Sequence, residues 1–267
     1  MTYKQLAPCN LGQIAASGQC FRMEARESGW WRVLAGDRCV RVRQEGDVLA
    51  FDTDEAGFDG FWRAYFDWDT DYAAMCAAVP VEDAFLRAAV AYGGGLRILR
   101  QGLWETLITF VISQNNNIPR IRNTVEALCR NWGERRTDRA GEPYHTFPTK
   151  EALTAADLPA LRAIGLGYRD KYIHAIAHSD FDPVAVAALP PDEARHALTA
   201  LPGVGPKVAA CVRLFGLHDL AAFPVDTWIR KMVARHYGGR FPLERYEGFA
   251  GVMQQYMFFY GRSVEES

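Results

Sequence analysis

The chain has 267 residues, of which 49% are hydrophobic and 12% aromatic, and its formal net charge is −2. These values are typical of a globular protein with a large core, and they exclude an intrinsically disordered chain. No apolar run approaches the roughly 18 residues that a membrane helix needs, and the N-terminus lacks the basic and apolar regions of a secretory signal, so we expect a cytoplasmic or nuclear protein without membrane contact.

The first 80 residues predict a small antiparallel sheet. Short runs rich in β-branched and aromatic residues are separated by turns that contain Gly-Asp, and residues 39–43 alternate in part with a period of two. The expected strands are Trp30–Leu34, Arg38–Gln44 and Val48–Asp52.

The remaining residues, 81–267, carry a helical pattern. An apolar stripe at helical spacing ends at three glycines at 93–95, and residues 104–112 are apolar enough to form a buried central helix. Residues 133–148 are charged and rich in turn formers, which predicts an exposed loop. The expected helices are Val81–Tyr92, Trp104–Ile112, Pro119–Trp132, Asp192–Ala200, Lys207–Phe215, Thr227–Tyr237 and Leu243–Tyr260, with Thr149 as the N-cap of a further one. The expected fold class is α+β, with a β-rich lobe (1–80) and a larger all-α part.

The cysteine pattern argues against a bound metal, and the charge distribution permits a partner that carries phosphates. Six scattered cysteines form no CxxC pair and no cluster with histidine, which predicts reduced thiols and no metal centre. Residues 45–83 contain eleven acidic residues and one basic residue, whereas residues 195–240 contain seven Lys or Arg and two acidic residues. A basic face beside an acidic lobe permits a phosphate-lined groove, although solvated helix faces would give the same pattern.

The most informative segment reads LPGVGPKVAAC and lies within a predicted helix-hairpin-helix at about 195–216. Gly203, Val204 and Gly205 form its turn, where glycine permits a positive φ and a close approach of the backbone. The amides of a new helix N-terminus bind anions such as a DNA phosphate. A plain helix connector is the alternative, but the preceding Leu-Pro, the following Lys207 and the flanking apolar residues favour a DNA-binding hairpin.

Lys207 and Asp226 are the candidate catalytic pair. Lys207 lies in the first turn of the second hairpin helix, where a partly buried lysine can act as a nucleophile. Asp226 follows 19 residues later and can also cap the helix that begins at Thr227. A capping carboxylate is held rigidly, which suits a group that stabilises cationic character on a sugar. Together the pair could detach a base from DNA. The alternatives are that Lys207 is an ordinary surface lysine and that Asp226 only caps a helix.

Four further segments read SGQCFR (17–22), SQNNNIPRI (113–121), GLGYR (165–169) and QQYMF (254–258). With the hairpin, Lys207 and Asp226, they resemble the 8-oxoguanine DNA glycosylase branch of the helix-hairpin-helix Gly/Pro-Asp superfamily of base-excision glycosylases. The segments lie in the family's order and cover most of the chain.

The resemblance implies a bifunctional DNA N-glycosylase and AP lyase that needs no cofactor. Lys207 would attack C1′ as the damaged base leaves and form a Schiff base, from which β-elimination cuts the strand. Asp226 would stabilise the developing oxocarbenium charge. The partner would be double-stranded DNA containing an oxidised purine, bound by a monomer in a bacterial nucleoid or a eukaryotic nucleus.

The resemblance also assigns a pocket for the extruded base. The backbone carbonyl of Gly18 would accept the N7–H that 8-oxoguanine has and guanine lacks. Cys211 and Phe258 would sandwich the base, and Gln254 would read its Watson–Crick edge. Without the resemblance, Cys211 and Phe258 would be interpreted as ordinary core residues.

The remaining implied roles concern the duplex. Asn115 would fill the space left by the extruded base, and Tyr168 would wedge beside the orphaned base. Arg120 and Arg169 would donate to the acceptors of an estranged cytosine, which predicts a preference for cytosine opposite the lesion. A helix-surface charge or a phosphate contact is the alternative for each arginine.

Two positions depart from the family pattern. Trp228 replaces a histidine that touches a phosphate in many relatives, and Gly261 replaces an aspartate near the base pocket. A glycosylase for another damaged base would share Lys207 and Asp226, so that alternative stays open. A non-catalytic DNA-binding protein is a further alternative, but it leaves both residues without a purpose.

Overall fold

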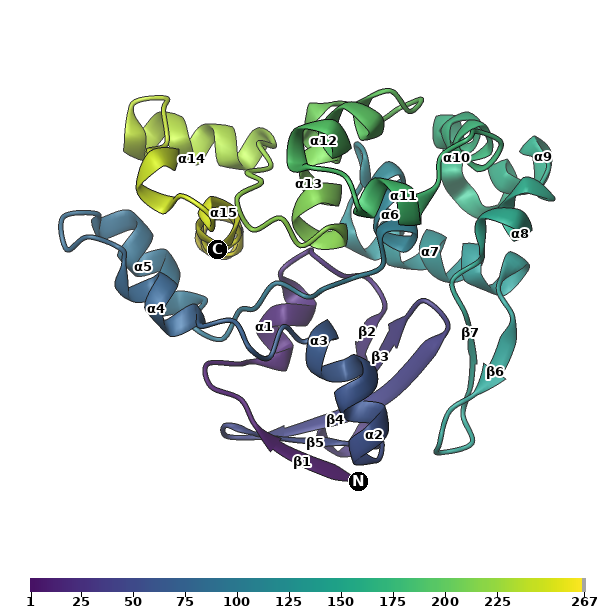
Figure 1. Ribbon diagram of the computed structural model, residues 1–267, viewed down its shortest axis with the longest axis horizontal. Helices are drawn as coiled ribbons and strands as arrows, with labels where there is room; N and C mark the ends of the chain where they lie inside the picture. Colours follow the sequence, from purple (N-terminus) through teal and green to yellow (C-terminus); the bar gives the residue numbers. More distant parts are fainter. Residues whose placement is uncertain (266–267) are drawn as a thin grey trace.

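The computed structural model describes residues 1–265, and its N-terminal part contains a five-stranded antiparallel sheet (Figure 1). The strands lie in the order β1-β5-β4-β3-β2, and every neighbouring pair is antiparallel. They are β1 (Thr2–Gln5), β2 (Met23–Ala25), β3 (Trp30–Ala35), β4 (Arg38–Glu45) and β5 (Val48–Phe51). The three predicted strands are confirmed, and the short edge strands β1 and β2 were not predicted.

The N-terminal part contains more helix than its β-rich pattern predicts. Its helical segments are α1 (Leu11–Ala16), α2 (Glu55–Gly57), a π-helical turn (Phe58–Trp62), α3 (Arg63–Tyr65) and α4 (Tyr72–Ala77). The carboxylates of Asp54 and Asp71 cap α2 and α4 by accepting from the amides of Gly57 and Ala74. The acidic run at 45–83 is therefore in part a set of helix caps, because carboxylates satisfy the free amides of a first turn.

The rest of the chain is mainly helical, so the α+β class is confirmed. Its longer helices are α5 (Ala84–Tyr92), α6 (Leu103–Ser113), α7 (Ile118–Trp132), α10 (Asp170–Ala177), α12 (Pro191–Thr199), α13 (Pro206–Gly216), α14 (Thr227–Tyr237) and α15 (Ala250–Glu265). Short segments between them are α8 (Lys150–Thr154), α9 (Leu158–Leu161), a π-helical turn (Arg162–Leu166), a 3₁₀ turn (Gly167–Arg169) and α11 (Pro183–Ala187). Thr149 caps α8 by accepting from Ala152 N. No helix within residues 1–265 is long and apolar enough to cross a membrane.

Two predicted segments differ from the structure. Residues 133–148 are not a loop but contain a hairpin of β6 (Arg135–Thr137) and β7 (Pro143–His145), which pair antiparallel. The predicted helix over 243–260 is broken into a 3₁₀ turn (Leu243–Tyr246) and α15. Gly248 between them has φ +82°, which a continuous right-handed helix cannot accommodate.

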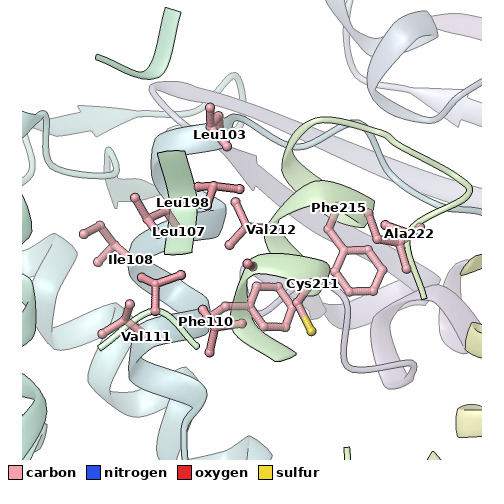
Figure 2. Close-up of a cluster of buried hydrophobic side chains, with 14 of the residues drawn as sticks. Leu103, Leu107, Ile108, Phe110, Val111, Leu198, Cys211, Val212, Phe215 and Ala222 are labelled. Atoms are coloured by element: carbon pink, nitrogen blue, oxygen red, sulfur yellow. The ribbon is translucent and has the colours of Figure 1, made fainter. Parts of the chain in front are cut away.

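Helix α6 is the centre of the main core. Eight of its eleven residues are buried, as expected for a helix that is apolar on all sides. Figure 2 shows its side chains, among them Leu107 and Val111, meeting Leu198 of α12 and Val212 of α13. This packing fixes the hairpin between α12 and α13 on a rigid support. A second core lies under the N-terminal sheet and includes Phe51 and Phe58.

Candidate active site

A cleft of about 830 Å³ lies where the N-termini of α13 and α14 meet the loop between α6 and α7. It brings together segments that are far apart in the sequence. The predicted site residues that line it are Gly18, Asn115, Tyr168, Gly205, Lys207, Asp226 and Phe258.

The hairpin turn between α12 and α13 uses its two glycines differently. Gly203 has φ +76°, and a Cβ there would lie 2.4 Å from the ring of Tyr172, so the backbone conformation and the packing both require glycine. Gly205 is extended with φ −83°, so it does not use the positive φ that glycine permits. Nothing lies within 4 Å of a Cβ built on Gly205, which borders the cleft. The absence of a side chain at Gly205 therefore leaves the hairpin backbone accessible from the cleft.

The backbone amides of the hairpin and of the first turn of α13 differ in whether they already have a hydrogen-bond partner. Val204 is buried in the core, and its N–H donates to Leu201 O at 3.1 Å, so its side chain does not reach the cleft. The N–H of Ala209 is the first of α13 to bond back, to Gly205 O at 3.0 Å. The amides that precede it in the first turn have no partner within the helix and are chemically suited to bind an anion.

Lys207 is the second residue of α13 and is half-buried. Its Nζ lies 5.5 Å from the centroid of the Phe110 ring, a distance at which an ammonium interacts favourably with an aromatic face. Phe110 lines the cleft from α6 and was not predicted as a site residue. No signal in the sequence distinguishes it, because nearly every residue of α6 is apolar.

Asp226 is the N-cap of α14, as the sequence predicts. Its Oδ1 accepts from Ile229 N at 2.8 Å, which fixes the side chain at the helix end. Within the described part of the chain no donor pairs with Oδ2. One carboxylate oxygen is therefore held by the fold while the residue borders the same cleft as Lys207.

A smaller cavity of about 60 Å³ lies behind the cleft and is lined by Gly18, Cys211, Gln254 and Phe258, together with Lys207 and Asp226. This is room for about two water molecules and far less than a purine occupies. Gly18 has φ +75°, and a Cβ on it would lie 3.3 Å from the Phe258 ring. Gly18 and Phe258 therefore pack closely against each other at this cavity.

The Cys211 thiol and the Gln254 amide are two of the buried polar or ionisable side chains that line this cavity. Burial raises the pKa of the Cys211 thiol, and the nearby Lys207 ammonium opposes that rise. Gln254 is only 4% exposed, and its Oε1 has no hydrogen-bond partner within residues 1–265. An unpaired buried acceptor is costly. Gln254 therefore presents an unused acceptor in the cavity.

The opposite wall of the cleft carries the residues expected to enter the duplex. Asn115 is exposed and has φ +46°, an uncommon conformation that asparagine tolerates better than most residues. Tyr168 is 49% exposed. Arg120 is exposed, and its Nη2 makes a long contact of 3.5 Å with Gly165 O.

Arg169 differs from Arg120 because it is buried, and neither arginine is among the residues that line the cleft. Its guanidinium donates to the backbone carbonyls of Gln114, Asn115 and Leu166. In this structure the side chain therefore holds the Asn115 loop, a contact that the sequence did not predict.

The two departures from the family pattern have local explanations. Trp228 lines the cleft, and Lys231 Nζ lies 5.2 Å from its ring. A Cβ on Gly261 would lie 3.3 Å from Met232 Sδ, so a larger residue requires Met232 to shift. The usual histidine and aspartate are thus replaced by an aromatic–cation pair and a close helix contact.

Comparison with known families agrees with this geometry. Residues 3–107 match the N-terminal domain of 8-oxoguanine DNA glycosylase, and residues 108–243 match the HhH-GPD superfamily of base excision DNA repair proteins. The chain belongs to the 8-oxoguanine DNA glycosylase branch of this superfamily. The resemblance found in the sequence is confirmed.

Individual relatives support this family assignment. The chain is 40% identical over 174 residues to a Saccharomyces cerevisiae N-glycosylase/DNA lyase, and the match covers 60% of this chain and 46% of the yeast protein. The matched region thus spans about half the length of that relative. A structure of MBOgg1 with a low-affinity DNA ligand has a TM-score of 0.92 at 34% identity and covers 99% of this chain and 100% of that one. Clostridium acetobutylicum 8-oxoguanine glycosylase/lyase, bound to DNA with cytosine opposite 8-oxoG, has a TM-score of 0.91 at 28% identity and covers 99% of both chains.

Proposed function

We propose that this protein excises 8-oxoguanine from duplex DNA through a covalent imine and then cuts the strand as an AP lyase. The observation that carries this proposal is the placement of Lys207 and Asp226 at the N-termini of two helices that border one cleft. The small cavity behind them offers a place for the extruded base.

The chemistry needs only groups on this chain and on the DNA. The unprotonated Lys207 amine attacks C1′, the glycosidic C–N bond breaks, and the leaving base takes up a proton. The C1′–O4′ bond then breaks, O4′ takes up a proton and remains on C4′ as a hydroxyl, and the Lys207 nitrogen forms the imine with C1′. Loss of a C2′ proton from the imine expels the 3′ phosphate and cuts the strand. Asp226 stabilises the positive charge that develops at C1′.

Base recognition is assigned to the four residues around the small cavity. Gln254 Oε1 lacks a donor in the free protein, and a guanine-type base presents N–H donors on its Watson–Crick edge. The carbonyl of Gly18 accepts the N7–H that only the oxidised base carries. Cys211 and Phe258 pack on the two faces of the base. An unmatched buried polar group costs about 1–3 kcal/mol, so one hydrogen bond can discriminate the lesion.

The duplex is held by groups on both walls of the cleft. The hairpin backbone at Gly203, Val204 and Gly205 binds a phosphate, while Asn115 and Tyr168 enter the space left by the extruded nucleotide. Arg120 and Arg169 donate to the estranged cytosine, and the protein acts as a monomer. The Clostridium relative was solved with cytosine opposite 8-oxoG, which is consistent with this choice of partner base.

A product assay tests the proposal. A duplex with one 8-oxoguanine opposite cytosine should release the base and be cut, while an undamaged duplex stays intact. Lys207→Gln should abolish both reactions with lesion binding largely retained, since glutamine preserves volume but is not nucleophilic. Lys4→Gln, on strand β1, is the matched control and should turn over normally. Turnover by Lys207→Gln would refute the assignment, and selective action on another damaged base would change the substrate.

A further inference from the structure

The guanidinium of Arg169 is buried but has no carboxylate partner. The side chain is 4% exposed, and the carboxylate of the adjacent Asp170 bonds instead to Arg162 Nε at 2.8 Å. Buried charges are normally paired with an opposite charge because desolvation is costly. Arg169 is instead stabilised by backbone carbonyls and by the ring of Tyr168, whose centroid lies 4.6 Å away. Within the described residues the guanidinium therefore lacks a negatively charged acceptor, and it can exchange these carbonyls for a stronger acceptor.

The donors of Arg169 are nearly all committed to one loop. Nε donates to Gln114 O at 2.8 Å, and Nη2 donates to the same carbonyl and to Asn115 O at 2.9 Å. Nη1 donates to Leu166 O at 3.1 Å. Four of the five N–H groups of a guanidinium are thus in use. A fork on two acceptors of a base needs two N–H groups, so Arg169 must release at least one carbonyl to form one.

The loop that Arg169 holds is the one that carries Asn115. Asn115 has φ +46° and is exposed, so its own side chain contributes little to holding this conformation. The bonds from Arg169 reach the carbonyl of Asn115 and that of the residue before it. Removing them frees the backbone on both sides of the Asn115 Cα.

Tyr168 covers the guanidinium on the side of the cleft. Its ring lies against Arg169, yet 49% of the residue is exposed and it lines the cleft. The exposed part of this ring can take a base as a stacking partner. A base stacked there would lie close to the guanidinium of Arg169.

We propose that Arg169 couples recognition of the base opposite the lesion to the conformation of the Asn115 loop. In the free protein it fastens the loop, and in the complex it transfers donors from the loop carbonyls to N3 and O2 of cytosine. Adenine offers no such adjacent pair of acceptors on its Watson–Crick edge, so the loop stays fastened and Asn115 enters less readily. This inference rests on the proposed function, but it concerns only the orphaned base.

The test uses a duplex that carries a tetrahydrofuran abasic analogue opposite either cytosine or adenine. This probe contains no damaged base, so it works even if the excised lesion is not 8-oxoguanine. Two quantities are measured: the ratio of the two dissociation constants, and the amide hydrogen exchange of the peptide 113–118 in free and bound protein. The variants are Arg169→Gln and, as the matched control, Arg120→Gln, whose side chain makes no bond to this loop.

Wild type should bind the cytosine duplex about tenfold more tightly, and loop exchange should differ between the two complexes. In Arg169→Gln the ratio should fall by about threefold or more, the free loop should exchange about tenfold faster, and the difference between complexes should vanish. Arg120→Gln should lower the ratio but leave exchange in the free loop unchanged. Altered exchange with an intact ratio, a lowered ratio with unaltered exchange, or a wild type that does not discriminate would each overturn the proposal.

Arg169→Lys guards against a variant that fails to fold, because it keeps the charge and most of the volume. A single ammonium cannot hold two carbonyls and form a fork. It should therefore shift both quantities in the same direction as Arg169→Gln, by smaller factors. Wild-type values of both quantities in a folded Arg169→Lys would contradict the proposal.

Discussion

Nε2 of His218 lies 3.1 Å from Oδ2 of Asp67, and this contact joins the segment after α13 to the N-terminal part of the chain. Both side chains are buried. Asp67 also accepts from Thr70, from Tyr72 and from Arg100. A single carboxylate thus joins three parts of the chain: residues 67–72, Arg100 and the segment after α13.

Asp67→Asn should lower the free energy of unfolding by about 1–3 kcal/mol, because it weakens several hydrogen bonds to a buried charge. Burial alone would raise the pKa of Asp67, but the close contact with His218 and the hydrogen bonds from Tyr72 and Thr70 outweigh it and hold that pKa below its usual range. A carboxyl with a lowered folded-state pKa stabilises the protein above the unfolded pKa of about 4, and this contribution is lost as the pH falls further. In urea unfolding from pH 7 to pH 3, the difference in stability between variant and wild type should therefore stay constant down to about pH 4 and begin to narrow below it, without vanishing at pH 3.

The control for that measurement is Asp69→Asn, since Asp69 pairs with Arg63 at an exposed site. Exposed ion pairs contribute about 0–1 kcal/mol. An equal loss of stability in Asp69→Asn and Asp67→Asn at pH 7 would show that the buried contact has no special role.

Gln254→Leu should keep or raise stability while it impairs excision. The variant removes a buried oxygen that lacks a partner in the free protein, and such a group costs about 1–3 kcal/mol. The neighbouring Gln255→Leu should instead lower stability, because Gln255 Nε2 donates to Ser17 O at 2.6 Å and the variant removes this buried hydrogen bond. Thermal melting and single-turnover excision separate the two variants. A large loss of stability in Gln254→Leu would mean that its oxygen is satisfied in the free protein.

Gly18→Ala should reduce both stability and excision. The residue has φ +75°, where a Cβ is strained by about 1 kcal/mol, and the added methyl group would lie 3.3 Å from Phe258. Gly36→Ala isolates the backbone strain, because Gly36 has φ +58° with nothing within 4 Å of its Cβ. Excision should fall in Gly18→Ala only, and equal excision by both variants would remove Gly18 from the base pocket.

Gly205→Ala should fold normally but bind every duplex more weakly. Its extended backbone suits any residue, and its Cβ would meet nothing in the free protein, so stability should stay the same or rise by about 0.4–1 kcal/mol. The methyl group would nevertheless stand between the hairpin amides and a phosphate. Gly203→Ala should instead destabilise the fold through contact with Tyr172. Unaltered affinity of Gly205→Ala for undamaged DNA would argue against a phosphate at this turn.

Local signals predicted the parts of the site that depend on a few neighbouring residues. The start of α14 at Thr227 is predicted because Asp226 supplies a capping side chain, and the structure confirms the predicted range Thr227–Tyr237. The hairpin was predicted for similar reasons. The family resemblance then grouped residues that the cleft brings together, such as Gly18 and Phe258.

Features that depend on distant partners could not be predicted in this way. Strand β1 forms because Thr2 pairs with Phe51, a contact that no local pattern reveals. Phe110 is one of several apolar residues of α6, so only the fold shows that it faces Lys207. The bonds from Arg169 go to backbone carbonyls, which every residue possesses. The sequence therefore predicts which side chains belong to the site better than it predicts the contacts that they make in the free protein.

Borohydride trapping on a duplex with one 8-oxoguanine opposite cytosine tests the central claim most directly. Reduction of the imine between Lys207 and C1′ should leave a covalent protein–DNA adduct, absent with undamaged DNA and absent in Lys207→Gln. Peptide mapping should place the adduct on α13. An adduct that persists in Lys207→Gln, or catalytic base release by wild type without any adduct, would contradict the proposed mechanism.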